Sequence, residues 1–364
     1  MSELDVKQFV YKKGAAGRIP VSGTFELTSR CNLSCKMCYV HMTPAEQKQV
    51  GRELSTEEWL RLGREAVDKG MIYLLLTGGE PFLRPDFVEL YTQLIKMGLL
   101  ISINTNGTLL TPEILACFKK HRPERVNVTL YGSSECTYGS LCGNSRGFEA
   151  AKRGILAMKE AGIRVTLNTT FTRLNVQDME DIVDFAKEHQ IPVRMSSYIF
   201  PPVRTIHETE DVNLTPEEMG RKAAYFDWIT LEEEKRTARA EMIRKALDSQ
   251  ITPEANKKSR ISSCMAGRGA FWVTWDGKMY PCGMLSDFSV DVRDRSFAEV
   301  WKDTCRWMAG AYLPEECVSC KYQVLCPSCA AVFQSENQAT DKVATRLCER
   351  TKAYAEEFLR YAEQ

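Results

Sequence analysis

The sequence predicts an α/β fold built on a parallel sheet, because short β-branched runs alternate with longer helical stretches between residues 22 and 202. The 364 residues carry 48 basic and 48 acidic side chains, and 44% of them are hydrophobic, which suits a globular chain with a sizeable core. There are 14 cysteines, and most of them are clustered at short spacings. In a reducing compartment, such clusters indicate metal-binding or catalytic roles rather than disulfides.

Six strands and five helices account for the alternating region. The strands are expected at Thr24–Thr28, Ile72–Leu76, Leu100–Asn104, Arg125–Leu130, Arg164–Thr169 and Val193–Tyr198. The helices are expected at Thr56–Lys69, Asp86–Met97, Pro112–Lys120, Gly147–Ala161 and Val176–His189. Capping residues at Ser55 and Thr111 support two of the helix starts. The alternation implies right-handed crossovers, but it fits an open barrel and a doubly wound sheet equally well.

Shifts in composition divide the chain into five parts. They are an N-terminal arm at 1–21, the alternating region at 22–202, a charged helical linker at 203–262, a cysteine-rich module at 263–349 and a C-terminal helix at 350–364. The arm and the linker carry many charges, so we expect both to be solvated. The balanced charge gives no reason to expect a nucleic-acid or membrane partner. Without a secretory signal or a bilayer-length apolar run, a cytoplasmic protein is expected.

The first cysteine cluster directly follows the first predicted strand. Cys31, Cys35 and Cys38 read C-x3-C-x2-C. Three thiolates can hold three irons of a cubane cluster, and the missing fourth ligand leaves one iron open. The alternative is a zinc site with a further ligand, for which His41 is a nearby candidate. After the second strand, Gly78-Gly79-Glu80-Pro81 offers glycines that allow close backbone approach and a carboxylate that can pair with an ammonium group.

These motifs resemble the signature of the radical SAM superfamily over roughly residues 22–200. The resemblance implies a partial (β/α)6 barrel and a catalytic 4Fe-4S cluster on Cys31, Cys35 and Cys38. It also implies S-adenosyl-L-methionine bound near Gly78, Gly79, Glu80, Pro81, Asn104, Asn106 and Asn168. In that family the reduced cluster cleaves this cofactor to a 5′-deoxyadenosyl radical, which takes a hydrogen from the substrate. A flavodoxin or ferredoxin is the expected electron donor. One departure is Tyr131, where many peptide-modifying relatives have an aspartate.

The C-terminal cysteines resemble a SPASM domain, the module of peptide- and sulfatase-modifying radical SAM enzymes. Gly277-x4-Cys282 is followed by C-x2-C-x5-C-x2-C and a final cysteine. The resemblance implies two auxiliary iron–sulfur clusters, a distal one on Cys317, Cys320, Cys326 and Cys348 and a proximal one on Cys264, Cys282 and Cys329. A further cysteine of some relatives is missing, so the proximal cluster has an open iron or uses Cys305. The alternative is a zinc ribbon, for which the gap between the two cysteine pairs is short.

The resemblance favours a maturase that acts on a ribosomally made precursor peptide and forms a thioether, a carbon–carbon crosslink or an epimerised centre. Formylglycine formation is disfavoured, because sulfatase maturases have an aspartate base directly after the cysteine that matches Cys282, and this chain has Gly283. A small-molecule substrate such as a haem precursor stays open. A non-catalytic iron–sulfur protein is disfavoured by the intact motifs. With about 21 residues before the first strand, either a separate leader-binding protein or the barrel itself is expected to bind the peptide.

Overall fold

The computed structural model describes residues 3–201, 212–248 and 264–364. Its central sheet contains six parallel strands, β1 (Ser22–Glu26), β2 (Tyr73–Thr77), β3 (Leu100–Thr105), β4 (Arg125–Thr129), β5 (Val165–Thr170) and β6 (Val193–Ser196). Each strand pairs with the next along the chain. Because this order never reverses, the sheet is of the barrel type and not doubly wound. The partial (β/α)6 barrel is thereby confirmed. Both ends of each predicted strand lie within two residues of the ends of the observed strand.

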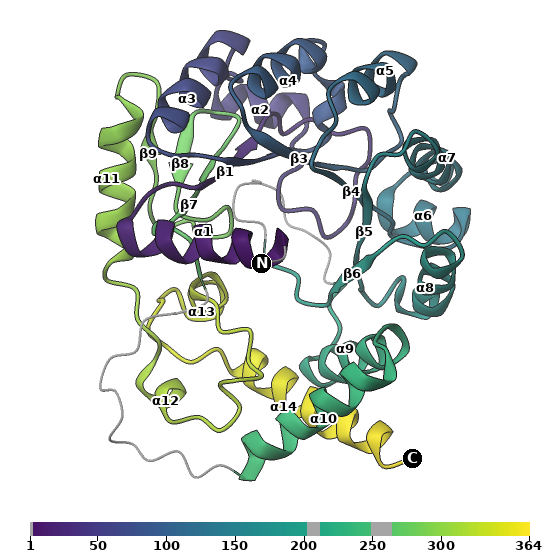
Figure 1. The fold of residues 1–364 in the computed structure, drawn as a ribbon. Helices are drawn as coiled ribbons and strands as arrows, with labels where there is room; N and C mark the ends of the chain where they lie inside the picture. The colour runs from purple at the N-terminus through teal and green to yellow at the C-terminus, as the bar shows by residue number, and fades with distance from the viewer. Residues whose placement is uncertain (1–2, 202–211, 249–263) are drawn as a thin grey trace.

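Helices cover the outer face of this sheet (Figure 1). They are α3 (Thr56–Asp68), α4 (Phe87–Lys96), α5 (Pro112–Lys120), α7 (Gly147–Glu160) and α8 (Met179–Glu188). In α3, Ser55 and Glu58 form a capping box, and Trp59 and Leu62 are buried against the sheet. The main hydrophobic core lies between these helices and the strands. Two further helices, α2 (Pro44–Val50) and α6 (Glu135–Cys142), lie in the loops after β1 and β4 and were not predicted.

The N-terminal residues form a helix, and its residues 6–17 are exposed or half-buried apart from Gly14. Helix α1 (Glu3–Gly17) lies across the ends where the strands begin (Figure 1). Lys7 Nζ donates to Glu124 Oε1 at 2.7 Å, just before β4. The rings of Tyr11 and Tyr73, the first residue of β2, are 5.3 Å apart. These contacts fix α1 at the end of the barrel opposite the loops that carry the cysteine motif.

The cysteine-rich module continues the barrel sheet. Its first strand, β7 (Ala270–Val273), pairs in parallel with β1, and β8 (Lys278–Tyr280) and β9 (Val290–Asp291) follow in antiparallel register. The module also contains α11 (Phe297–Met308), α12 (Glu315–Val318) and α13 (Ala330–Asn337). The pairing covers the free edge of β1 and seats the module beside the first strand–helix loop.

The described part of the predicted linker forms two helices that are packed rather than merely solvated. Helices α9 (Pro216–Thr230) and α10 (Glu233–Asp248) share a small core with α14 (Thr345–Ala362), built around Ala224, Ile243 and Phe358. Helix α14 begins at Thr345, so the predicted boundary between residues 349 and 350 falls inside it. Of the predicted linker, residues 203–211 and 249–262 lie outside the described residues. Within the described ranges, no helix is both long and apolar enough to cross a bilayer.

Candidate active site

The three clustered cysteines lie on the loop between β1 and α2, which is tied to the loop after β2. Gly79 N donates to Thr28 O at 2.7 Å, and Glu80 N donates to Arg30 O at 2.8 Å. On its other side, the cysteine loop contacts the end of α6, because Ser34 N of the loop donates to the carbonyl of Cys142 at 3.0 Å. The loop is therefore held by backbone contacts on both sides.

Burial governs the chemistry of these thiols. It raises the pKa of Cys31 to about 12 and that of Cys38 to about 11. A hydrogen bond with the Cys142 thiol, together with burial, raises the pKa of Cys35 well above its usual range. Buried thiols become thiolates readily only beside a cation, and iron supplies that charge. Three sulfur donors on one half-buried loop therefore fit the iron–sulfur cluster that the sequence implies.

The cysteines face a cavity of about 430 Å³ at the carboxyl ends of the strands. Most of the predicted site residues line it, namely Cys31, Cys35, Cys38, Gly78, Gly79, Asn104, Asn106, Asn168 and Tyr131. The structure thus brings together residues from the loops and ends of the first five strands. The rest of the wall includes residues that sequence reasoning missed, among them Ser196, Tyr198, Ile199, Phe200 and Met284. Their only signal was that Ser196 ends the sixth strand and the next three follow it, at the same end of the sheet as the other site residues.

The two glycines of the loop after β2 allow that loop to approach the cysteine loop closely. A Cβ on Gly79 would lie 2.3 Å from the Arg30 carbonyl oxygen, and one on Gly78 would lie 2.6 Å from that of Thr28. Gly78 also has a φ of +153°. Any side chain at position 79 would therefore push the cysteine loop away. The sequence predicted close approach at these glycines to a cofactor, and the structure adds close approach to the cysteine loop.

Glu80 lies behind the cavity wall and holds a neighbouring loop. Its buried carboxylate accepts hydrogen bonds from Thr105 Oγ1 at 2.8 Å, Asn106 N at 2.7 Å and Phe82 N at 3.1 Å. Burial raises its pKa to about 7. Asn106 lines the cavity, and its Nδ2 lies 3.7 Å from Cys31 Sγ. The geometry therefore makes Glu80 a support for Asn106; like Pro81, it does not line the cavity.

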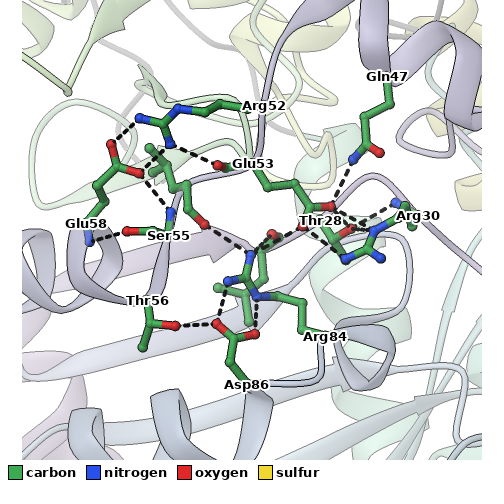
Figure 2. Close-up of polar contacts among 12 residues, drawn as sticks. Thr28, Arg30, Gln47, Arg52, Glu53, Ser55, Thr56, Glu58, Arg84 and Asp86 are labelled. Atoms are coloured by element: carbon green, nitrogen blue, oxygen red, sulfur yellow. Dashed lines mark hydrogen bonds and ion pairs between the residues drawn. The ribbon is translucent and has the colours of Figure 1, made fainter.

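A network of ion pairs connects the same two loops from outside the cavity (Figure 2). Arg84 is buried, and its guanidinium donates to the carbonyl oxygens of Leu27 at 3.1 Å and Leu54 at 3.2 Å. It also pairs with Asp86 at 2.6 Å and with Glu53 at 3.4 Å. Because Leu27 follows β1 and Arg84 follows the glycine loop, this side chain joins the bases of both cofactor loops.

Glu53 extends the network to the residues just before the first cysteine. It accepts from Arg30 Nη2 and Nε, both at 3.0 Å, and from Gln47 Nε2 at 2.8 Å. Thr28 donates to the same carboxylate (Figure 2). Burial of the carboxylate raises the pKa of Glu53, but the hydrogen bonds from Arg30 and Thr28 lower it. The pKa of Glu53 is lowered overall. An ionised Glu53 thus holds the start of the cysteine loop.

Four of the C-terminal cysteines share one cavity, and three others pack against an apolar core that Cys317 and Cys326 also contact. The four predicted distal ligands line one cavity of about 190 Å³; they are Cys317, Cys320, Cys326 and Cys348. Burial and the neighbouring cysteines together raise the pKa of Cys317 to about 12. The three predicted proximal ligands, Cys264, Cys282 and Cys329, pack against one apolar core of the module. The four thiols that share a cavity suit the distal cluster that the resemblance implies, and the proximal cluster stays a prediction.

Cys305 lies beside the proximal group. It lines a small cavity of about 20 Å³ together with Cys264 and Arg18. Gly267 lies in the stretch where some relatives have a further cysteine, and a Cβ on it would lie 2.4 Å from Met308 Cγ. Among the described residues, no three His, Cys, Asp or Glu side chains are arranged to hold a single metal ion. In a cubane, by contrast, each cysteine binds a separate iron.

A partial barrel with a three-cysteine loop and a glycine loop at its mouth defines the radical SAM class of enzymes. Residues 25–186 match the family model described as Radical SAM superfamily. Residues 25–186 of the chain therefore form a radical SAM domain.

Two curated relatives align with most of the chain. An AdoMet-dependent heme synthase from Methanosarcina barkeri is 28% identical over 323 residues, which cover 84% of this chain and 90% of that protein. A PqqA peptide cyclase from Ruegeria pomeroyi is 29% identical over 341 residues, which cover 90% of this chain and 87% of that protein. The chain thus resembles proteins of two different functions to a similar degree.

Two solved structures share the fold. SuiB of Streptococcus suis bound to S-adenosylmethionine has a TM-score of 0.65 at 17% identity, covering 96% of this chain and 81% of that one. The structure of anSMEcpe with bound AdoMet has a TM-score of 0.68 at 17% identity, covering 94% and 99%. These likenesses extend over nearly the whole chain, so the C-terminal module belongs to the shared fold.

Proposed function

We propose that this radical SAM enzyme oxidises a peptide, joining two of its residues by a thioether or carbon–carbon bond. The observation that carries the proposal is the character of the cavity wall. None of the described residues that line it has an acidic or basic side chain, and the wall is built from thiols, amides, hydroxyls and apolar groups. Such a wall suits the side chains and uncharged backbone of a peptide.

The size of the cavity supports the same substrate class. Its volume of about 430 Å³ must hold the cluster and S-adenosylmethionine as well as the reacting part of the substrate. Ligand pockets of this kind range from about 300 to 1,000 Å³, so this one is at the small end. A single peptide side chain can enter while the rest of the peptide stays at the mouth.

The second candidate is oxidation of a haem precursor, which the similarity to AdoMet-dependent heme synthases favours. A porphyrin precursor of haem is a wide macrocycle with carboxylate side chains. The carboxylates of a bound ligand are commonly held by arginine or lysine side chains. The described lining of the cavity provides none, so we rank this candidate second.

Formylglycine formation is not part of the proposal, because position 283 leaves no room for the base that it requires. A Cβ on Gly283 would lie 2.6 Å from the ring of Trp272. An aspartate could be placed there only if the indole moved. Gly283, which argued against this function in the sequence, is thus also constrained by its packing against Trp272.

In this proposal, different residues hold the iron–sulfur cluster and S-adenosylmethionine. Cys31, Cys35 and Cys38 would hold the cluster, and the backbone of Gly78 and Gly79 with Asn104, Asn106 and Asn168 would hold S-adenosylmethionine. Together these groups supply a 5′-deoxyadenosyl radical. The chain's own part is to orient the substrate hydrogen and to exclude water. A flavodoxin or ferredoxin is the proposed electron donor, and a separate leader-binding protein is a proposed partner.

The experiment compares the two substrate classes in one anaerobic assay. Iron-loaded enzyme, S-adenosylmethionine and dithionite are incubated either with short peptides encoded beside the gene or with an iron porphyrin that carries propionates. Cys35→Ala, treated identically, is the control for unspecific reduction. We expect a peptide to lose two hydrogens in step with 5′-deoxyadenosine, while the porphyrin stays unchanged. Conversion of the porphyrin with no change in any peptide would overturn the proposal in favour of the second candidate.

A further inference from the structure

The cavity wall is shared by the barrel and the cysteine-rich module, and Tyr198 lies where they meet. Tyr198 follows β6 and lines the cavity. Its hydroxyl lies 3.1 Å from Ser335 Oγ and donates to Glu336 Oε1 at 3.2 Å. Burial raises the pKa of Tyr198 to about 12, so the hydroxyl stays protonated at neutral pH and keeps this donor role.

The two partners of Tyr198 belong to the element that follows a predicted cluster ligand. Ser335 and Glu336 lie on α13, which begins directly after Cys329. The second oxygen of Glu336 accepts from Arg346 N at 3.3 Å, on the helix that carries Cys348. One carboxylate therefore joins the tyrosine of the cavity to elements that bear ligands of both predicted auxiliary clusters.

Apolar packing strengthens the same junction. The rings of Tyr198 and Phe200 meet edge to face at 5.0 Å, and both pack against the core of the cysteine-rich module. From the module side, Met284 lines the cavity, and its backbone N–H lies 3.5 Å from Cys282 Sγ. Among the described residues, the module thus contributes Met284 to the cavity wall, two positions after the predicted proximal ligand Cys282, and Tyr198 connects the wall to α13.

We propose that Tyr198 is a positioning residue that fixes the auxiliary cysteines relative to the radical cavity through its hydrogen bonds to Ser335 and Glu336. The proposal goes beyond the assignment of cofactors, because it names the side chain that couples the two halves of the site. It rests on the proposed function in one respect, namely that the reaction removes two hydrogens from its substrate.

The balance of that reaction explains why the position of the module matters. One hydrogen atom leaves the substrate with 5′-deoxyadenosine. As the new bond forms, the second hydrogen leaves as a proton, and the remaining electron must pass to an oxidised acceptor, for which we name an iron–sulfur cluster of the module. If that acceptor is displaced, the substrate radical instead takes an electron from the dithionite of the assay and a proton from water, and 5′-deoxyadenosine forms without product.

The test is a double-mutant cycle on the hydrogen bond. Tyr198→Phe removes only the hydroxyl oxygen, Glu336→Ala removes its acceptor, and the double variant removes both. Tyr225→Phe is the matched control, because Tyr225 also donates to a glutamate, Glu180 at 2.5 Å, but does not line the cavity. All proteins are compared at equal iron content, and the amounts of product and 5′-deoxyadenosine are measured together.

We expect each single variant to lower the product made per 5′-deoxyadenosine about fivefold, the effect of one lost hydrogen bond, and the double variant to be no worse. The kcat for product should fall while the KM for the peptide stays unchanged, which general loosening of the fold would not produce. The control should behave as the unmodified enzyme. An unchanged ratio in Tyr198→Phe, or additive effects in the double variant, would overturn the proposal.

A second readout needs no substrate and separates this proposal from the proposed function. Hydrogen exchange of residues 330–337 is measured in the iron-loaded enzyme with S-adenosylmethionine alone. Faster exchange in Tyr198→Phe than in Tyr225→Phe supports the positioning role even if no peptide is converted. Equal exchange in both variants contradicts it, whatever the substrate proves to be.

Discussion

Replacing Arg84 by alanine tests whether the ion-pair network holds the two cofactor loops together. The Arg84 side chain is 6% exposed, whereas its partners Glu53 and Asp86 are 19% and 21% exposed. Removing one partner of a buried ion pair destabilises a protein by about 3–5 kcal/mol. Since water reaches both carboxylates, we expect the lower end, about 3 kcal/mol. Arg84→Lys keeps the charge but loses the forked geometry, so its effect should be smaller.

The assay is urea unfolding of the iron-free protein under reducing conditions, followed by circular dichroism. Arg306→Ala is the control, because Arg306 also pairs with an aspartate but its side chain is 68% exposed. That variant should lose at most about 1 kcal/mol. If Arg84→Ala is no less stable than Arg306→Ala, the network does not hold the loops as we infer. If Arg84→Lys and Arg84→Ala are equally destabilised, the charge contributes little and the geometry dominates.

Three further predictions test single contacts. A hydrogen bond from Arg52 lowers the pKa of Glu58 to about 2, so this contribution is full above the ordinary value of 4.5 and is lost as the pH falls toward 2. Because this pair is largely solvated, Glu58→Gln should lower stability by only about 0.5 kcal/mol at pH 7 and by nothing near pH 2, as thermal unfolding at both pH values can check. Gly79→Ala should abolish formation of 5′-deoxyadenosine, because its Cβ meets the Arg30 carbonyl oxygen at 2.3 Å; a normal rate would contradict the loop contact. Gly283→Ala should lower the urea midpoint, because the added methyl group lies 2.6 Å from an indole ring, and an unchanged midpoint would argue against that packing.

The barrel could be predicted because its signals are local. Strand runs, helix caps and turn glycines repeat regularly, and Pro112–Lys120 was predicted with the observed bounds. The cysteine loop and the glycine loop meet because parallel strands bring their carboxyl ends to one edge. That these two loops meet follows from the direction of the strands and does not depend on side-chain contacts.

What the sequence could not predict depends on contacts between distant segments. Helix α1 has little apolar patterning of its own, and its place is set by single contacts such as that of Lys7 with Glu124. The roles of Arg84 and Tyr198 depend on partners far along the chain, Leu54 and Glu336 among them. No local pattern identifies such pairs. The pairing of β7 with β1 was missed for the same reason.

The central claim is that the three-cysteine loop generates a radical in the cavity and that this radical oxidises a peptide. The most direct measurement compares Cys38→Ala with Cys136→Ala, a change of an exposed cysteine outside the cavity lining. Both proteins are loaded with iron and incubated with S-adenosylmethionine, dithionite and the peptide, and 5′-deoxyadenosine and peptide mass are followed together. The account predicts that Cys136→Ala forms 5′-deoxyadenosine and a peptide lighter by two hydrogens, whereas Cys38→Ala forms neither. Undiminished 5′-deoxyadenosine from Cys38→Ala would contradict it.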